Sequence, residues 1–254
     1  GFRLDAVKHI DSFFMANFIR DILQEYGDDF YVFGEFWNND EAANNDYLEN
    51  IDYRFDLVDV KLHTNLFEAS QKGEEYDLRT IFDHTLVKNH PESAVTFVEN
   101  HDTQRGQALE STVEEWFKPA AYALILLRES GLPCIFYGDY YGISGEFAQQ
   151  DFREEIDKLL DLRLNLAYGE ETDYFDDPNC IGWTRAGQEG SQPIAVLISN
   201  ATATSKRMYF GQDWSGHECS DYLGNCQTIV TIDEEGWGEF PVEEQSVSVW
   251  SIKN

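Results

Sequence analysis

The amino-acid sequence predicts an α/β domain with parallel strands over residues 1–168, followed by an antiparallel β-sandwich over residues 169–254. Short apolar strands alternate with amphipathic helices through the first two-thirds of the chain. After Gly169 helical periodicity disappears, and period-two strands separated by turn residues replace it. Alternating strands and helices indicate parallel strands with right-handed crossovers. Short alternating strands between turn residues favour a sandwich.

About five strand–helix units are expected in the first domain. Strands are predicted in FRLDAV, FYVFGEF, FDLVDV, SAVTFVEN and LPCIFYG. Helices are expected at 12–26, in NDEAANNDYLEN, in HTNLFEASQ, in the polar segment YDLRTIFDHTLVKNHP, in VEEWFKPAAYALILLRES and at 152–168. In the second domain, strands are predicted in CIGWTRA, IAVLISN, KRMYF, QTIVTI and SVSVWSI.

The composition argues against two classes of partner. The 254 residues carry a net charge of −30, from 48 acidic and 18 basic side chains. Such a field repels a phosphate backbone and an anionic membrane face. No apolar run is long enough to span a bilayer. We therefore expect neither nucleic acid nor a membrane as a partner.

The cysteines indicate the redox state of the compartment in which the protein is expected. Cys134, Cys180, Cys219 and Cys226 have no CxxC spacing, and four cysteines could pair in three ways. A chain of this size needs no disulfide scaffold, so we expect free thiols and a reducing, cytoplasmic environment. Cys134 lies in LPCIFYG, which reads as a buried strand. Secretion is the alternative, because the chain starts at Gly1 and shows nothing of any targeting segment.

Three acids stand where predicted strands end. Asp5 ends the first strand, Glu35 ends the second, and Asp102 follows the fourth. Sites in parallel α/β sheets and barrels are built at the carboxyl ends of strands. A single acid there can be a helix cap or an ion-pair partner. Three acids from different units are better explained by a shared task.

Carboxylates that face each other across a cleft suit glycoside hydrolysis, which needs a proton donor and a negative neighbour for the oxocarbenium-like transition state. Aromatic residues flank Glu35, and desolvation should raise its pKa as a general acid requires. Arg3 shares a strand face with Asp5 and is expected to hold that carboxylate ionised.

The segments GFRLDAVKH, GEFW and FVENHDTQ, in this order and spacing, resemble the signature regions of the α-amylase family. The resemblance continues through STVEEWFKPAAYALILLRESGLP, FYGDYYG, IGWTR and EGWGEF, so it covers essentially the whole chain. Bacterial liquefying and intracellular α-amylases are the most similar group. The resemblance implies an endo-acting, retaining hydrolase of α-1,4-glucans such as starch, glycogen and maltodextrins.

The resemblance also implies a role for each matching residue. Asp5 is expected as the nucleophile that forms a glycosyl-enzyme, Glu35 as the acid/base, and Asp102 as the carboxylate that grips sugar hydroxyls. The other implied substrate contacts are those of Arg3, Lys8, His9, Trp37 and His101. For Trp37 the alternative is ordinary core packing, and for Lys8 a solvated position on the barrel rim.

By the same resemblance, the first domain corresponds to strands 4–8 of a TIM (β/α)8 barrel. We therefore expect a C-terminal part whose N-terminal half, with three strands and a loop domain, is a missing partner. Calcium is the implied cofactor of the intact parent, and only the His9 carbonyl remains of its main site. A further calcium site near Glu74 to Tyr76 is doubtful, because Asn179 and Asn200 stand where relatives have acids.

Two alternatives to the hydrolase remain open. Transglycosylases of the same superfamily share the three acids and differ in whether water or a sugar hydroxyl attacks the intermediate. Amylase-like barrels can also be non-catalytic glucan-binding or partner subunits, which usually lose catalytic acids. Here Asp5, Glu35 and Asp102 are all present.

Overall fold

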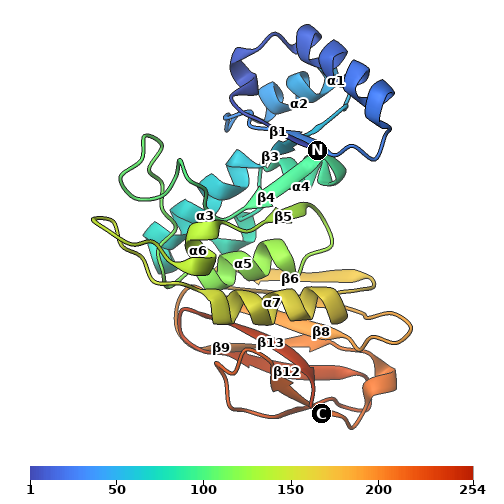
Figure 1. Ribbon diagram of the computed structural model, residues 1–254. Coiled ribbons are helices and arrows are strands. Elements are labelled where there is room, and N and C mark those ends of the chain that lie inside the picture. The colour runs from blue at the N-terminus through green and yellow to red at the C-terminus, as the bar shows by residue number, and fades with distance from the viewer. Residues whose placement is uncertain (254) are drawn as a thin grey trace. The chain divides into compact units, whose positions relative to one another are not determined.

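The computed structural model describes residues 1–253, which form two compact units (Figure 1). The first unit comprises residues 1–65, 82–97 and 130–134. The second comprises 66–81, 98–129 and the rest of the described chain from residue 135. None of the helices within residues 1–253 combines the length and the apolar character needed to cross a lipid bilayer.

The first unit is built on a five-stranded sheet in the order β1-β2-β3-β4-β5, and every neighbouring pair is parallel. The strands are β1 (Phe2–Leu4), β2 (Val32–Gly34), β3 (Asp56–Val58), β4 (Ala94–Phe97) and β5 (Leu132–Cys134). All five lie inside the runs predicted from the sequence, in sequential order. This confirms the parallel part of the predicted fold and leaves β1 and β5 as edge strands.

Helices follow the strands of this unit. They are α1 (Ser12–Tyr26), α2 (Glu41–Asn50) and α4 (Leu86–Asn89), with the 3-10 turns η1 (Val7–His9) and η4 (Pro91–Ser93), while α3 (Val60–Lys72) begins here. Helix α1 has the bounds predicted from the sequence, and local signals fix both of its ends. The Asp11 side chain accepts a hydrogen bond from Phe14 N at 2.9 Å, and Gly27 ends the helix at φ 92°.

The polar segment over 76–91 is not the single helix that the sequence predicted. It contains only the 3-10 turn η3 (Leu78–Thr80) and the one-turn helix α4, after another 3-10 turn, η2 (Gly73–Glu75). Asp77 and Thr85 each cap their own short turn with a side-chain oxygen. His84 adopts φ 60°. Local capping and a left-handed residue therefore divide the segment.

In the second unit, the helices are α5 (Lys118–Leu126), α6 (Tyr137–Tyr141) and α7 (Arg153–Asn165). Helix α5 is shorter than the predicted 113–130 and begins with Pro119 in its first turn, where a proline costs no hydrogen bond. Every residue of α5 except Pro119 is buried. Helix α7 is amphipathic and buries Ile156, Leu159 and Leu162.

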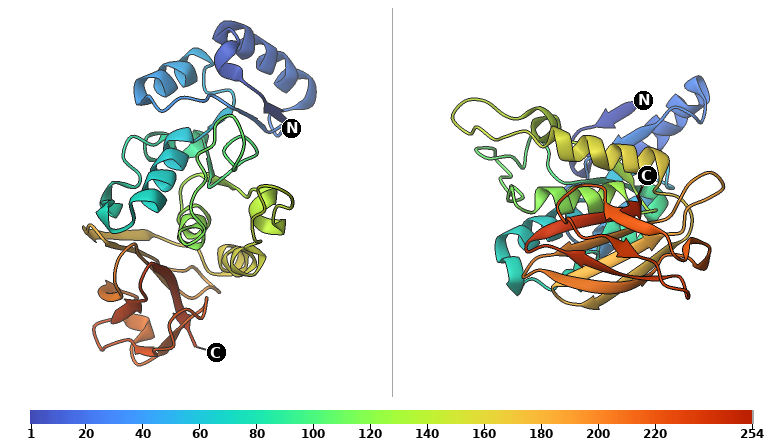
Figure 2. Two further views of the ribbon diagram at one scale, coloured as in Figure 1. Left: turned by 90° about the vertical axis from the view of Figure 1, so that its left-hand side faces the viewer. Right: turned by 90° about the horizontal axis from the view of Figure 1, so that it is seen from below.

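Two antiparallel sheets make up the β-rich tail of this unit (Figure 2). One has six strands in the order β11-β10-β13-β8-β7-β6, and the other pairs β12 with β9. Side chains from both sheets share one core, which includes Leu197, Met208, Phe240 and Trp250. The strands are β6 (Glu171–Asp177), β7 (Cys180–Arg185), β8 (Ile194–Ser199), β9 (Thr204–Tyr209), β10 (Glu218–Asp221), β11 (Val230–Thr231), β12 (Trp237–Val242) and β13 (Ser246–Ile252), with the 3-10 turn η5 (Gln212–Trp214).

Three tail strands were not predicted, namely β6, β10 and β12. Strand β6 reads ETDYFDD, which is too acidic to be recognised by apolar alternation. Arg128 neutralises part of this charge, because its guanidinium pairs with Glu171 at 2.8 Å and with Asp173 at 2.5 Å. A charge from outside the strand therefore compensates a composition that disfavours strands.

The four cysteines are free thiols. Cys180, Cys219 and Cys226 are buried, but Cys134 is exposed, so its predicted burial is wrong. The reason is that Cys134 lies on β5, an edge strand of the five-stranded sheet.

Candidate active site

Two of the three predicted catalytic acids lie side by side in the first unit. Asp5 directly follows β1, and Glu35 directly follows β2. In the parallel pairing of these strands Leu4 lies opposite Gly34, and Glu35 N donates to Leu4 O at 2.9 Å. Asp5 and Glu35 therefore both stand at the carboxyl end of the sheet, on adjacent strands.

The backbone on either side of these acids is tightly constrained. A Cβ at Gly34 would lie 2.8 Å from the Phe55 ring and 3.1 Å from Val7, so only glycine fits directly before Glu35. Ala6 follows Asp5 with φ 51° and ψ 36°, a left-handed conformation that is unfavourable for alanine. Such strain persists where the surrounding structure imposes it, and it is common at active sites.

Glu35 has the properties of a general acid. Its side chain is buried, and this desolvation is the main cause that raises its pKa above the usual value. The Arg3 guanidinium lowers the pKa of Glu35, and the neighbouring Asp5 carboxyl raises it further. A raised pKa favours the protonated form of Glu35, which is the form that a general acid needs.

Arg3 is paired differently from the sequence-based expectation. Its Nη2 donates to Glu35 Oε1, where Asp5 was predicted as the partner. The strand-face argument placed Arg3 beside the next carboxylate of its own strand. The parallel partner β2 brings Glu35 to the same end of the sheet, and the guanidinium reaches across the strand pair.

Lys8, His9 and Trp37 were predicted as substrate contacts. Lys8 is exposed, and its Nζ donates to Trp37 O at 3.1 Å, so it ties two of the candidate loops together. His9 is exposed in η1. The Trp37 ring is half-buried, with its centroid 6.4 Å from that of His63 and 6.1 Å from that of Phe97. Core packing thus accounts for part of the Trp37 surface.

Asp102 and His101 lie in the second unit, on the turn that follows β4 in the chain. Asn100 Oδ1 accepts hydrogen bonds from Asp102 N at 2.9 Å and from Thr103 N at 3.0 Å. The half-buried Asp102 carboxylate has Oδ2 3.6 Å from Nε2 of the exposed His101. Both side chains are thus presented by one hydrogen-bonded turn.

A buried ionic cluster near this turn was missed from the sequence. Lys118, Glu99 and Asp139 have completely buried side chains, and Lys118 Nζ pairs with both carboxylates. Tyr122 OH donates to Asp139 Oδ2 at 2.6 Å. One signal was available, since a lysine within the apolar run WFKPAAYALIL is difficult to explain without buried partners.

The segment considered for a second calcium ion contains a closed set of hydrogen bonds instead. Asn200 Nδ2 donates to Gly73 O and to Tyr76 O, each at 2.8 Å. Asn179 Nδ2 donates to Glu74 O at 2.8 Å and to Asn200 Oδ1 at 3.0 Å. The three carbonyl oxygens thus face N–H donors, which does not suit a cation. Within residues 1–253 no group of three or more His, Cys, Asp or Glu could hold a metal ion.

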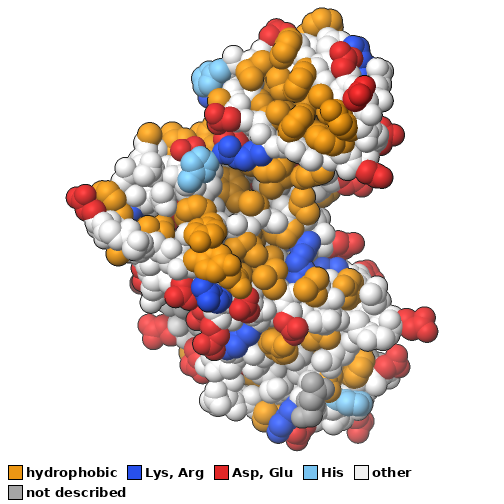
Figure 3. Space-filling model, viewed as in Figure 1, with side chains coloured by type: hydrophobic (Ala, Val, Ile, Leu, Met, Phe, Trp, Pro, Cys, Tyr) orange, Lys and Arg blue, Asp and Glu red, His pale blue; other side chains and the backbone are white. Residues whose placement is uncertain are grey.

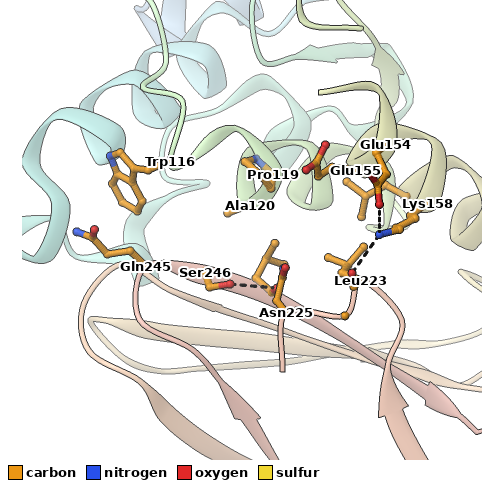
Figure 4. Close-up of a pocket in the computed structure, with 13 residues that line it drawn as sticks. Trp116, Pro119, Ala120, Glu154, Glu155, Lys158, Leu223, Asn225, Gln245 and Ser246 are labelled. Atoms are coloured by element: carbon orange, nitrogen blue, oxygen red, sulfur yellow. Dashed lines mark hydrogen bonds and ion pairs between the residues drawn. The ribbon is translucent and has the colours of Figure 1, made fainter. Parts of the chain in front are cut away.

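A pocket of about 480 Å³ lies in the second unit (Figure 4). Trp116 and Pro119 stand on one side of it, Glu155 and Lys158 on another, and Asn225 below. Lys158 Nζ bridges Glu154 Oε1 at 2.9 Å and Leu223 O at 3.2 Å. None of the predicted catalytic or substrate-binding residues lines this pocket.

Comparison with known protein families shows to which family the chain belongs. The family described as "Alpha amylase, catalytic domain" matches residues 1–191, and "Alpha-amylase C-terminal" matches residues 194–251. The chain belongs to the α-amylase family. Asp5, Glu35 and Asp102 all fall within the match to the catalytic domain.

Curated relatives of the α-amylase family match along nearly the whole chain. Glucan 1,4-alpha-maltohexaosidase of Bacillus sp. (strain 707) is 46% identical over 100% of this chain and 49% of its own length. The α-amylase of Bacillus licheniformis is 43% identical over 98% of this chain and 50% of its own. The cytoplasmic α-amylase of Escherichia coli (strain K12) is 39% identical over 100% and 53%. The chain thus spans about half the length of these relatives.

Solved structures share the α-amylase fold. An α-amylase from Geobacillus thermoleovorans, complexed with acarbose, superposes with a TM-score of 0.70 at 22% identity, over 100% of this chain and 60% of that one. The cyclomaltodextrin glucanotransferase CldA gives 0.73 at 20% identity, over 99% and 56%. These similarities confirm the predicted fold class, which is part of a (β/α)8 barrel followed by a β-rich domain.

Proposed function

We propose that the protein is an endo-acting, retaining α-amylase that cleaves internal α-1,4-glucosidic bonds of starch, glycogen and maltodextrins. The observation that carries this proposal is the Asp5–Glu35 pair, in which an exposed carboxylate and a buried carboxyl of raised pKa stand at the ends of two paired parallel strands. Retaining glycosidases need this asymmetry, because one carboxyl acts as nucleophile while the other donates a proton.

The proposed reaction has two steps. Asp5 attacks the anomeric carbon and forms a glycosyl ester, while Glu35 gives its proton to the departing glycosidic oxygen. Glu35, now ionised, then takes a proton from water, and that water attacks the same carbon and releases Asp5. Asp5 and water attack opposite faces of the anomeric carbon, one after the other, so the two inversions together retain the α configuration. Burial favours the return of the proton to Glu35, which restores the acid.

The remaining predicted residues have supporting roles in this proposal. Arg3 orients Glu35 through their ion pair and moderates its pKa. His101 and Asp102 hydrogen-bond the sugar bound at the cleavage point, and Lys8, His9 and Trp37 line the leaving-group side. No calcium ion is assigned to the carbonyls of Gly73, Glu74 and Tyr76, because asparagine donors satisfy them.

A second polypeptide segment is proposed as a partner, corresponding to the half of the relatives that this chain does not match. We call it the complementing half. In the first unit, β1 is an edge strand, and α1 exposes 75% of Phe13 and 58% of Phe14. Hydrophobic side chains gather on this face (Figure 3). A further strand could pair with the open edge of β1, and a further helix could cover the apolar face of α1.

Two finer assignments accompany this function. We propose a cytoplasmic location, which the four free thiols and the similarity to the cytoplasmic α-amylase of Escherichia coli support. We also propose that the catalytic domain ends near residue 168 and that the sandwich domain begins at 169. Helix α7 ends at Asn165 and β6 starts at Glu171, which supports a boundary between them.

The test is an assay on soluble starch of the chain together with the complementing half. We expect release of maltodextrins, and loss of this release in Asp5→Asn but not in the control Asp21→Asn, which changes an exposed aspartate on α1. Equal turnover by Asp5→Asn would contradict the proposal. Products that grow longer on addition of a sugar acceptor would indicate a transglycosylase instead.

A further inference from the structure

The buried side chain of Thr103 anchors the turn that carries His101 and Asp102. Thr103 is fully buried, and its Oγ1 donates to Glu99 Oε1 at 3.0 Å. The same hydroxyl oxygen accepts from Asn100 N at 2.9 Å. The residues on both sides of the His101–Asp102 pair are therefore tied to Glu99.

Glu99 is itself fixed by ions that have no access to solvent. Its Oε2 lies 3.1 Å from Lys118 Nζ, and both side chains are fully buried. Lys118 also pairs with Asp139 and donates to Gln149 Oε1 at 2.9 Å, and its ammonium lies 5.6 Å from the centroid of the Phe152 ring. Three segments of the second unit thus converge on Lys118.

This arrangement is costly if its only purpose is stability. Burying a lysine with two carboxylates imposes a desolvation cost that a well-packed apolar core would avoid. The arrangement does restrain the Glu99 carboxylate, because Oε2 faces the buried Lys118 ammonium at 3.1 Å, although it makes no hydrogen bond within residues 1–253, while Oε1 accepts the Thr103 hydroxyl. The restraint is passed on through Thr103, and Thr103 O is held in turn by Ser111 N at 2.9 Å and Thr112 Oγ1 at 3.1 Å.

We propose that Glu99 is a positioning residue of the active site, which fixes the Asp102 turn through the Thr103 hydroxyl. Lys118 and Asp139 serve this role by fixing Glu99. The inference rests on the proposed function, because Asp102 is taken to act on the bound sugar. According to this proposal, Thr103 does not need to touch the substrate. It determines how precisely the Asp102 carboxylate is placed against the bound sugar.

The kinetic test uses Thr103→Val and Thr103→Ser in the chain supplied with the complementing half. Valine keeps the shape of threonine but removes the hydroxyl, so Glu99 Oε1 and Asn100 N lose their partner. We expect kcat to fall about tenfold or more, with KM changed less than about twofold. Serine keeps the hydroxyl and should restore kcat. A Thr103→Val enzyme that melts at a lower temperature but keeps its kcat would overturn the inference.

A second measurement does not depend on turnover. Amide hydrogen exchange at Asp102 and Thr103, whose N–H groups donate to Asn100 Oδ1, should become faster in Thr103→Val and stay near the unsubstituted rate in Thr103→Ser. Amides of β8 serve as the internal reference. Unchanged exchange in Thr103→Val would overturn the positioning role. If the unsubstituted protein shows no turnover, the proposed function is wrong. The exchange measurement then still tests whether the Thr103 hydroxyl fixes the Asp102 turn.

Discussion

The Arg3–Glu35 ion pair sets how the protein should respond to pH. Burial raises the pKa of Glu35 and Arg3 lowers it. Glu35 must be protonated to act as an acid, so activity falls as pH rises through its pKa. Arg3→Met removes the lowering influence, and we expect the alkaline limb of kcat/KM to move to higher pH. The control Arg20→Met changes an exposed arginine on α1 and should leave the limb in place.

Replacing the acid itself gives a larger effect. Glu35→Gln keeps the shape of the side chain but cannot donate a proton, and we expect kcat on starch to fall by about 10²–10⁴-fold. The alkaline limb should disappear in the remaining activity. A Glu35→Gln variant that keeps the alkaline limb would mean that another group is the acid.

Glu99 should make stability depend on pH. Burial raises its pKa from 4.5 to about 7, although Lys118 opposes the shift. Between pH 4.5 and about 7, Glu99 therefore binds a proton more often in the folded state than in the unfolded state. The contribution of Glu99 to the free energy of unfolding is therefore full below this pH window and decreases as pH rises through it.

Glu99→Gln removes this titration. Urea unfolding across the window should show that the variant gains stability relative to the unsubstituted protein as pH rises, by about 3 kcal/mol at most. Glu154→Gln, at an exposed position on α7, is the control. A constant stability difference between Glu99→Gln and the unsubstituted protein would show that Glu99 titrates normally.

Individual elements differ in how far the sequence could predict them. The bounds of helix α1 agree with the predicted 12–26, and in the structure Asp11 and Gly27 cap its two ends. The parallel strands were predicted from their apolar runs. Strand β6 was not, because its acidic side chains depend on Arg128, which lies outside the strand. Ion pairs between distant parts of a chain leave no local pattern that names both partners, so the Arg3–Glu35 pair was missed. For the Lys118 cluster, the lysine in an apolar run indicates buried partners but not which residues they are.

The link between η2 and the β7–β8 strands leads to a prediction about metal binding. Asn179 and Asn200 donate to three carbonyls of residues 73–76. Asn179→Asp with Asn200→Asp replaces these donors by carboxylates, which together with the carbonyls form an oxygen-rich calcium site. We expect the double variant to melt at a lower temperature than the unsubstituted protein in chelator and to be stabilised by added calcium.

The control for this experiment is Asn165→Asp, at an exposed position at the end of α7. Neither this variant nor the unsubstituted protein should show a calcium-dependent melting temperature. A calcium-dependent increase in the unsubstituted protein would mean that the asparagine amides do yield to a metal ion.

At the scale of the whole molecule, we expect this chain alone to be inactive on starch. Strands β1 and β5 present open edges, and Asp5 follows directly from the edge strand β1. Unpaired edges favour aggregation, and catalysis needs its carboxylates held to a fraction of an ångström. Size-exclusion chromatography should show association of the chain alone, and addition of the complementing half should restore both a discrete species and turnover. Turnover by a monodisperse chain alone that is lost in Asp5→Asn would contradict this expectation.

The most direct test of the catalytic assignment is to trap the glycosyl-enzyme. The complemented protein is incubated with a fluorinated α-glucosyl fluoride that forms the intermediate but slows its hydrolysis, then digested and analysed by mass spectrometry. The account predicts one glycosyl adduct, on the peptide that contains Asp5, and none in Asp5→Asn. An adduct on Glu35 or Asp102, or an active enzyme that releases the β-anomer without any adduct, would contradict it.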